Sequence, residues 1–404
     1  MRLPIYLDYQ ATTPVDPRVL DAMLPFFSEV YGNAASRSHQ FGWTAEEAVT
    51  KARKQIASVI GATPKEIIFT SGSTEAINLV LKGAVEMYPT RGKHIITSLV
   101  EHKAVLDVCK HLENEGCEVT YLKPDKSGRV TVEQVEEAMR PDTLIVALIW
   151  ANNEIGTLNP IREIGALCHE KKVLFFTDAT QAVGKVPVDV EADNIDLLCL
   201  SGHKIYGPKG IGCLYVRRKN PRVRLTAQVD GGGHERGMRS GTLNVPGIVG
   251  LGAACELCET DFDKDLARMT ELRDRFEKQI FDRLDYVYLN GNKDHRLPHA
   301  TNISFAYVEG ESLIMGMKDL AVSSGSACTS ASLEPSHVLR ACEVGDELAH
   351  SSIRFSVGRT TTEEEVDFAA EQVITAVERL RELSPLYEMA QEGIDISSID
   401  WGGH

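Results

Sequence analysis

Short apolar runs alternate with amphipathic segments through the first two thirds of the chain. Residues 66–70, 94–97 and 144–149 have continuously apolar centres, which is typical of strands that are buried on both faces of a sheet. Helical spacing of apolar residues separates such runs, for example at residues 73–87 and 161–170. This alternation predicts an α/β fold with a mainly parallel sheet covered by helices. Ligands of such sheets bind at the carboxyl ends of the strands.

The pattern changes after about residue 260. A long, charged helix is predicted over residues 261–285, and strand-like runs follow at residues 300–305 and 353–356. This order of elements favours a smaller α+β domain. We therefore predict two domains: a large one of residues 15–261, and a small one of residues 1–14 together with 262–404.

Capping signals predict a final helix. Thr361 and Thr362 each lie three residues before a glutamate, which is the spacing of a capping box. The helix runs to Leu383, and Pro385 ends it because proline has no backbone N–H to continue the pattern. The tail after Pro385 is short and mixed in composition.

Composition narrows the class of function. With 43 Lys and Arg against 58 Asp and Glu, the formal net charge is −15, which argues against direct binding to nucleic acid or anionic membranes. No apolar run is long enough to cross a bilayer, and the first residues lack the features of a signal peptide. The nine cysteines show no paired spacing, so we expect a reducing, cytoplasmic location. One basic cluster is interpreted as a solvated loop, with docking of an acidic partner as the alternative: Arg217, Arg218, Lys219, Arg222 and Arg224.

The first candidate for chemistry is the turn at residues 70–75, between a predicted strand and a predicted helix. Gly72 allows a tight turn, and Ser73 and Thr74 place hydroxyl and N–H groups at the start of the helix. Such a helix start binds phosphate through its dipole and its unpaired N–H groups. The alternative is an ordinary N-cap by serine or threonine.

Two further candidates, Asp178 and Lys204, also follow buried strands. Asp178 could pair with a protonated pyridine nitrogen, as the anchoring carboxylate of pyridoxal phosphate does; an N-cap for the next helix is an equally good alternative. Lys204 lies in a Gly-rich turn beside apolar residues and could form a Schiff base, whereas most lysines are solvated surface charges. Groups for phosphate, ring nitrogen and aldehyde thus occur in order along successive strand ends.

Four more polar residues lie close to strand ends or within a strand. His102 could stack on a cofactor ring and move protons, or face solvent as a polar residue of the first turn. Asn153 and Gln181 could donate hydrogen bonds to a ring oxygen. Arg354, inside a short strand, needs a carboxylate partner, which could come from a substrate or from a nearby Asp or Glu.

Cys328 differs from the other cysteines because it lies in a small, polar stretch, residues 322–332. Such a stretch favours a mobile loop with an exposed thiol, and a reactive thiol needs access. The alternative is a linker cysteine without a role. The other cysteines lie in or beside apolar periodic segments and are interpreted as small core residues: Cys109, Cys117, Cys168, Cys199, Cys213, Cys255, Cys258 and Cys342.

Together these motifs make the chain resemble the IscS-type cysteine desulfurases, which belong to the fold-type-I pyridoxal-phosphate enzymes and the class-V aminotransferase group. The resemblance starts at residues 6–14 and spans almost the whole chain. Its most specific motifs are residues 201–210, 231–242 and 323–332. The bulky Trp150 departs from the family pattern.

The resemblance implies a role for each candidate. Lys204 would carry pyridoxal 5'-phosphate, and Cys328 would be the nucleophile that then carries persulfide sulfur. His102 would stack on the ring and assist proton transfer. The other residues would hold the cofactor and substrate: Asp178 at the pyridine nitrogen, Gln181 at the ring hydroxyl, Ser73, Thr74, Ser201 and His203 at the phosphate, Thr242 at the same phosphate from a second subunit, Asn153 at the cofactor, and Arg354 with Asn153 at the cysteine carboxylate.

The resemblance also implies partners. The substrate would be L-cysteine, the enzyme would be a homodimer, and sulfur would pass to an IscU-type iron–sulfur scaffold and to carriers for tRNA thiolation. No metal is expected in the isolated chain, although Cys328 could become an iron–sulfur ligand shared with the scaffold. Direct contact with nucleic acid or membrane is not expected.

Two alternatives to the desulfurase remain at this point. One is another pyridoxal-phosphate enzyme of the same fold, such as a selenocysteine lyase or an aminotransferase; an aminotransferase has no use for a thiol at Cys328. The other is a non-catalytic assembly scaffold, which would not need to keep Lys204, Asp178 and His102 together.

Overall fold

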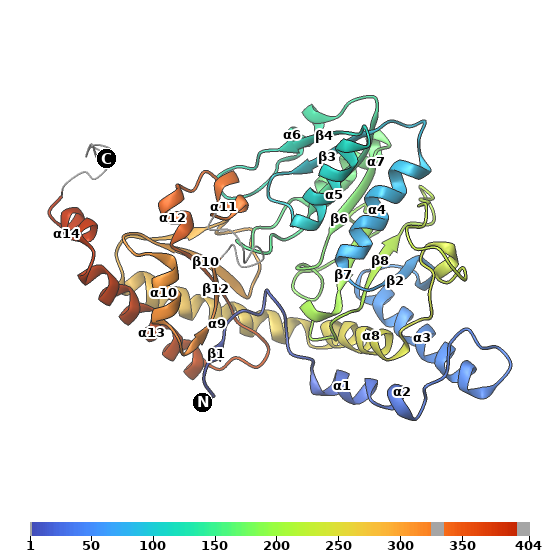
Figure 1. The fold of residues 1–404 in the computed structure, drawn as a ribbon, viewed down its shortest axis with the longest axis horizontal. Coiled ribbons are helices and arrows are strands. Elements are labelled where there is room, and N and C mark those ends of the chain that lie inside the picture. The colour runs from blue at the N-terminus through green and yellow to red at the C-terminus, as the bar shows by residue number, and fades with distance from the viewer. Residues whose placement is uncertain (1, 325–334, 394–404) are drawn as a thin grey trace.

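The computed structural model describes residues 2–324 and 335–393. A central sheet of seven strands has the order β2-β8-β7-β6-β5-β3-β4 (Figure 1). Neighbouring strands are parallel except in the two pairs that include β8. The predicted α/β fold with a mainly parallel sheet is therefore confirmed. The strands are β2 (Ile67–Thr70), β3 (His94–Ser98), β4 (Glu118–Leu122), β5 (Thr143–Ile149), β6 (Leu174–Asp178), β7 (Leu197–Ser201) and β8 (Gly212–Val216).

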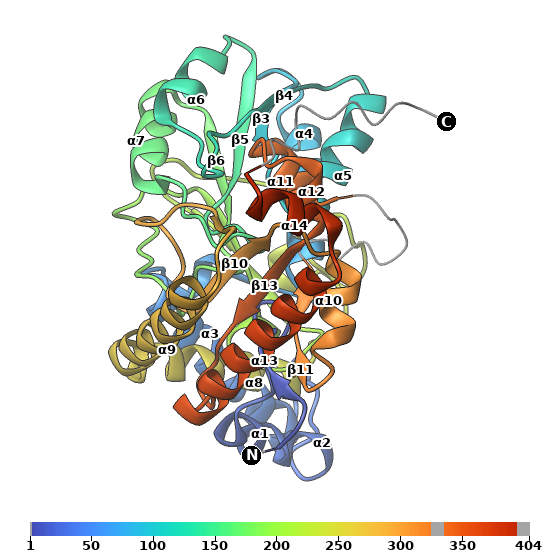
Figure 2. The same cartoon turned by 90° about the vertical axis from the view of Figure 1, so that its left-hand side faces the viewer.

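Helices cover both faces of this sheet (Figure 2). In β5, Val146 and Leu148 belong to one buried cluster, while Ile145 and Ala147 belong to another. Alternate side chains of a strand point to opposite faces, so a strand between two helical layers is apolar at every position. The helices on the first face are α3 (Gln40–Val59), α7 (Ile161–Lys171) and α8 (Val245–Thr260), and those on the second are α4 (Ser73–Met87) and α5 (Lys103–Asn114).

The antiparallel strand β8 was not among the predicted strands. It pairs with β2 on one side and β7 on the other. A short connection from β7 to β8 passes through the Gly-rich stretch of residues 202–211, which includes the 3-10 turn η2 (Gly202–Lys204). A hairpin of this kind reverses the chain direction without a crossover helix, so the helix–strand alternation does not reveal it.

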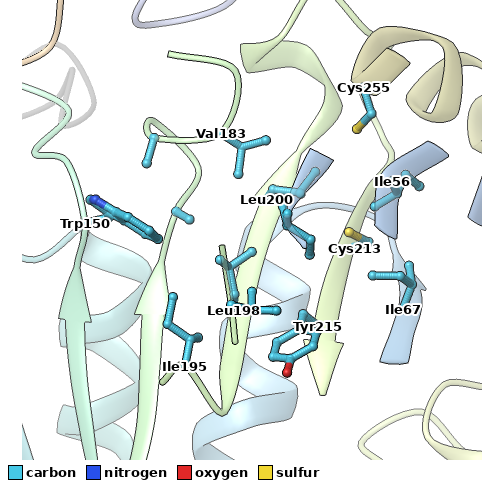
Figure 3. Close-up of a cluster of buried hydrophobic side chains, with 14 of the residues drawn as sticks. Ile56, Ile67, Trp150, Val183, Ile195, Leu198, Leu200, Cys213, Tyr215 and Cys255 are labelled. Atoms are coloured by element: carbon cyan, nitrogen blue, oxygen red, sulfur yellow. The ribbon is translucent and has the colours of Figure 1, made fainter. Parts of the chain in front are cut away.

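Trp150, which departs from the family pattern, belongs to the core. It is buried in the same cluster as Leu198, Leu200 and Tyr215 (Figure 3). The prediction that most cysteines are small core residues is confirmed for those that the structure describes, all of which are buried and free of disulfides: Cys109, Cys117, Cys168, Cys199, Cys213, Cys255, Cys258 and Cys342.

The second part of the chain forms a separate antiparallel sheet of order β12-β13-β10-β9 beside the central sheet (Figure 1). Its apolar side chains pack against long helices, together with Ile5 and Leu7 of the N-terminal segment. The strand β1 (Ile5–Tyr6) pairs with β11 (Leu320–Ala321). The remaining elements here are α9 (Phe262–Arg283), β9 (Val287–Asn290), β10 (Ala300–Phe305), α10 (Gly310–Gly316), β12 (Ser323–Ser324), α11 (His337–Ala341), α12 (Asp346–His350), β13 (Ser352–Ser356) and α13 (Glu363–Glu382).

The smaller elements complete the first part of the chain. They are α1 (Pro17–Met23), α2 (Pro25–Ser28), η1 (Pro64–Glu66), α6 (Val132–Ala138) and η3 (Glu235–Gly237). Among the described helices, none combines the length and the apolar character that a membrane span requires.

One detail at the C-terminal end differs from the prediction, and the structure adds a helix that was not predicted. Thr362 alone forms the capping box of α13, whereas the hydroxyl of Thr361 accepts a hydrogen bond from the N–H of Gly358. The tail after Pro385 contains a short helix, α14 (Pro385–Gln391). Proline ends α13, but it also suits the first position of a new helix, where its missing N–H is not needed.

The basic cluster is not entirely a solvated loop. Arg217, at the end of β8, is buried and donates to the carbonyl oxygens of Ile195 and Val190 at 2.9 and 2.7 Å. It also pairs with Glu191 and Asp196. Of the remaining members, Arg218 is half-buried and Lys219, Arg222 and Arg224 are exposed.

The capping box of α13 yields a stability prediction. Thr362 is exposed, and its hydroxyl accepts from the N–H of Glu365 at 3.2 Å. Replacing Thr362 with Ala should lower the free energy of unfolding by about 1 kcal/mol, because one helix N–H loses its partner. Replacing Thr362 with Ser keeps the hydroxyl and should cost much less. Urea unfolding of both variants measures the difference, and equal midpoints would contradict the capping role.

Candidate active site

A cavity of about 550 Å³ lies at the carboxyl ends of the central strands. Residues from the ends of β2, β3, β5, β6 and β7 line it, together with the N-terminal segment and β13. It brings together most of the predicted site residues: Ser73, Thr74, His102, Asn153, Asp178, Gln181, Ser201, His203, Lys204 and Arg354.

Two predicted residues are not in this group. Thr242 is exposed and does not line the cavity. Cys328 lies outside the described residues.

The turn before α4 does not use its serine or threonine as an N-cap. The N-cap is Gly72, with a φ of 153° and no side-chain cap, so the capping alternative is wrong. The hydroxyl of Ser73 instead lies 2.6 Å from that of Thr180. A helix start without a side-chain cap keeps N–H groups for a ligand, and these groups bind anions. A Cβ on Gly212 would lie 2.8 Å from the Cα of Gly72, so β8 needs glycine where it passes this turn.

Asp178 ends β6 and is almost fully buried. Its Oδ1 accepts from the N–H of Thr180 at 3.0 Å, from the hydroxyl of Thr180, and from the thiol of Cys199 at 3.3 Å. A turn rather than a helix follows, so Asp178 is not a helix N-cap. Thr180 was missed by sequence reasoning. Its hydroxyl contacts both the carboxylate of Asp178 and the hydroxyl of Ser73, in the turn before α4.

Lys204 ends η2, one residue after His203, and is only partly exposed. Its Nζ donates to the backbone oxygens of Gln10 and Ala11 at 2.6 and 2.8 Å. It is therefore held inside the cavity and is not a solvated surface lysine.

His203 lies beside Lys204, with Nδ1 at 3.2 Å from the hydroxyl of Thr12. Burial, followed by the positive charges of Lys204, Lys209 and Lys185, lowers the pKa of His203 to about 4. The imidazole is therefore neutral at pH 7 and acts as a hydrogen-bonding group rather than a cation.

His102 is the N-cap of α5, where its Nδ1 accepts from the N–H of Ala104 at 3.1 Å. It is half-buried and lines the cavity. The residue before it, Glu101, is buried and was missed by sequence reasoning. Its Oε1 accepts from the hydroxyl of Ser98 and from the N–H of Ile149, at 2.7 and 2.9 Å. No feature of the sequence distinguishes it from an exposed first-turn glutamate.

Arg354 enters the cavity from β13 of the second sheet. The alternation of β13 turns Ile353 and Phe355 toward the helices, so Arg354 points the other way. Its NH2 donates to Oδ1 of Asp8 at 2.7 Å, and its NH1 donates to the backbone oxygen of Asn153 at 2.8 Å. Of the two predicted partners for this arginine, a carboxylate of the chain itself is present.

Comparisons with known proteins cover the whole chain. Residues 5–368 match the class-V aminotransferase family. The chain is 59% identical over 401 residues to the cysteine desulfurase IscS of Anaeromyxobacter dehalogenans, covering 99% of each. It is 58% identical over 404 residues to the IscS of Neisseria meningitidis, covering 100% of each. A solved NifS-like protein is similar with a TM-score of 0.86 at 36% identity, covering 94% of this chain and 100% of the other.

The chain belongs to the IscS-type cysteine desulfurases of the class-V aminotransferase family. The desulfurases of this family depend on pyridoxal phosphate, so the predicted enzyme class and cofactor are confirmed. The cavity fits that cofactor on the evidence of its own groups: a helix start without a side-chain cap, a buried carboxylate at Asp178, and an inward-facing lysine at Lys204.

Glu101 makes the stability of this desulfurase depend on pH. Burial raises its pKa from 4.5 to about 8, so the folded state holds a proton that the unfolded state has lost. Stability should therefore fall as pH rises from about 4.5 to 8, by at most about 1.4 kcal/mol per pH unit. When the free energy of unfolding from urea titrations is plotted against pH over this range, Glu101→Gln should give a shallower slope than wild type. Glu137→Gln, on the exposed surface, is the control; identical slopes for wild type and Glu101→Gln would contradict the prediction.

Proposed function

We propose that the chain removes sulfur from L-cysteine in the cavity at the carboxyl ends of the central strands, releasing L-alanine and leaving a persulfide on Cys328. The observation that carries the proposal is the convergence of Lys204, Asp178 and the start of α4 on that one cavity. These groups come from separate strand ends, and they match the aldehyde, ring nitrogen and phosphate of the cofactor.

Each side chain has a task that follows from its position. Lys204 carries the cofactor, and Asp178 keeps the pyridine nitrogen protonated. His102 packs on the ring, while Gln181 and Asn153 supply hydrogen bonds to cofactor oxygens. The phosphate is held by the start of α4 and by neighbouring polar groups: Ser73, Thr74, Ser201 and His203.

Bound pyridoxal phosphate supplies an electron sink that eases loss of the substrate Cα proton. Arg354, with Asn153, orients the substrate through its carboxylate. Lys204 or His102 takes the Cα proton. The thiolate of Cys328 then attacks the substrate sulfur, so that an S–S bond forms while the bond from sulfur to Cβ breaks. Protonation of the remaining three-carbon unit gives alanine.

The described residues on either side of the Cys328 segment are attached to the cavity wall. Ser323 in β12 pairs with Arg354 in β13. Ser336, at the start of α11, hydrogen-bonds the carboxylate of Glu154, the residue after Asn153. This arrangement supports delivery of the Cys328 thiol to the cavity. A shared buried cluster of Ile5 and Leu7 with side chains of α9, β10, β13 and α13 supports the division into a domain of residues 15–261 and one of residues 1–14 with 262–404.

A homodimer is part of the proposal because Thr242 has no place in the cavity of its own chain. Two ion pairs attach the segment that carries Thr242 to the rest of its own chain. Glu235 pairs with Arg53 at 2.7 Å, and Arg239 pairs with Glu75 at 2.8 Å. Thr242 itself is exposed. A firmly held segment with an exposed tip suits donation of Thr242 to the phosphate of a second subunit.

We further propose that the enzyme works in the cytoplasm and passes sulfur to an IscU-type scaffold and to carriers for tRNA thiolation. Cys328 could serve there as an iron–sulfur ligand shared with the scaffold. The family of the relatives supports this assignment. The net charge of −15 argues against direct binding of the enzyme to nucleic acid or membranes.

Two substitutions test the chemistry. Cys328→Ala should keep the visible absorbance of the bound cofactor and lose persulfide and alanine formation, because only the sulfur acceptor is removed. Lys204→Ala should lose the absorbance band of the lysine-bound cofactor. Cys117→Ala, at a thiol outside the cavity, is the control. Normal alanine release by Cys328→Ala would disprove the nucleophile, and a normal band in Lys204→Ala would disprove the attachment site.

Mixing two inactive variants tests the shared site. Lys204→Ala and Thr242→Val should each have little activity as pure proteins. If each cavity uses Thr242 of the partner, mixed dimers contain one intact site. Unfolding and refolding the variants together should then restore about a quarter of the wild-type activity. No recovery, despite mixed dimers detected by mass spectrometry, would contradict the donation of Thr242.

A further inference from the structure

The hydroxyl of Thr180 connects two parts of the cofactor cavity. Thr180 follows β6, lines the cavity and lies two residues after Asp178. Its Oγ1 donates to Oδ1 of Asp178 and lies 2.6 Å from Oγ of Ser73 at the start of α4. In the proposed function, Asp178 pairs with the ring nitrogen, and the start of α4 holds the phosphate. Thr180 therefore lies between the residues that serve the two ends of the cofactor.

The protons of these hydroxyls fix the direction of both hydrogen bonds. An ionised carboxylate can only accept, so Thr180 gives its single O–H proton to Asp178. The contact between Ser73 and Thr180 then needs the hydroxyl of Ser73 as its donor. A phosphate dianion also can only accept. The hydroxyl of Ser73 therefore cannot donate to a phosphate while it donates to Thr180, and the backbone N–H is the group that Ser73 has left for the phosphate.

The same carboxylate oxygen of Asp178 accepts from two further donors. The N–H of Thr180 donates to Oδ1 at 3.0 Å, and the thiol of Cys199 in β7 donates to it at 3.3 Å. Burial, followed by the charge of Asp178, raises the pKa of Cys199 well above its ordinary value, so the thiol keeps its proton. Among the described residues, every hydrogen bond to this carboxylate goes to Oδ1. Oδ2 is thereby left for a group in the cavity.

We propose that Thr180 and the hydroxyl of Ser73 are positioning groups for Asp178. Ser73 donates to Thr180, Thr180 donates to Oδ1, and Oδ2 is presented to the ring nitrogen of pyridoxal phosphate. The inference rests on the proposed function, in which Asp178 pairs with that nitrogen. It limits the part of Ser73 in phosphate binding to the backbone N–H and assigns its hydroxyl to the support of the carboxylate.

The first experiment compares two probes that differ only in the phosphate, pyridoxal 5'-phosphate and pyridoxal. Each probe is titrated into the full chain after removal of the cofactor, and the absorbance band of the lysine-bound form gives the dissociation constant. Thr180→Val should weaken the binding of both probes by about tenfold, because Asp178 loses a charge-assisted hydrogen bond. Ser73→Ala should weaken the binding of both probes by one common factor of about threefold, since a hydrogen bond between neutral groups contributes less.

A double variant tests whether the two hydroxyls act in sequence. Once Thr180 is replaced with Val, the hydroxyl of Ser73 has lost its acceptor, so Ser73→Ala should add little to the effect of Thr180→Val. Thr180→Ser keeps the hydroxyl and should restore the affinity for both probes toward that of wild type. Thr260→Val, at the exposed end of α8, is the matched control and should bind both probes as wild type does. Melting curves verify that each variant is folded.

Three results would overturn the inference. The first is a folded Ser73→Ala variant that binds pyridoxal as tightly as wild type does; a loss confined to pyridoxal 5'-phosphate would mark its hydroxyl as a phosphate ligand. The second is wild-type affinity of Thr180→Val, or a loss in Thr180→Ser as large as that in Thr180→Val. The third is a double variant in which the two single effects add. The proposed function fails separately: if Lys204→Ala retains the lysine-bound band, the attachment site is wrong, irrespective of Ser73 and Thr180.

Discussion

The ammonium of Lys204 is held by the backbone oxygens of Gln10 and Ala11, at 2.6 and 2.8 Å, and much of the site depends on this contact. A partly buried amine needs acceptors, and here the acceptors come from a segment remote in sequence. Two residues further on, Thr13 donates from both its N–H and its hydroxyl to the carbonyl oxygen of His203. The N-terminal segment thus fixes the turn that carries Lys204 through backbone as well as side-chain contacts.

The same segment reaches the second sheet. Ile5 and Leu7 are buried among the side chains of α9, β10, β13 and α13. Asp8, between these anchors and Gln10, pairs with Arg354 at 2.7 Å. Residues 5–13 therefore contact both parts of the chain, so the distance from Lys204 to Arg354 is set by one continuous stretch of backbone.

The part of the site that follows from the central sheet was predictable. Asp178, Ser201 and Lys204 follow continuous apolar runs, and the carboxyl ends of parallel strands meet at one edge. Arg354 was placed in a strand, but its partner Asp8 could not be identified, because an exposed acid in an N-terminal segment looks the same in sequence. Strand β8 was missed because the hairpin that forms it contains no helix between its strands. Glu101 was missed because its burial depends on contacts with Ser98 and Ile149 at the ends of two other strands.

The ionisation of the buried groups explains how such a site could accept a phosphate. His203 is neutral at pH 7 because its pKa is about 4, and Glu101 keeps its proton because its pKa is about 8. The side of the cavity at α4 offers N–H groups, hydroxyls and a neutral imidazole, with Lys204 and Lys209 also in the cavity wall. Oriented dipoles at a helix start stabilise a phosphate dianion without requiring a cation in direct contact with it. Lys204 and Arg354 line the same cavity, where the proposed reaction needs an amine and an anchor for the substrate carboxylate.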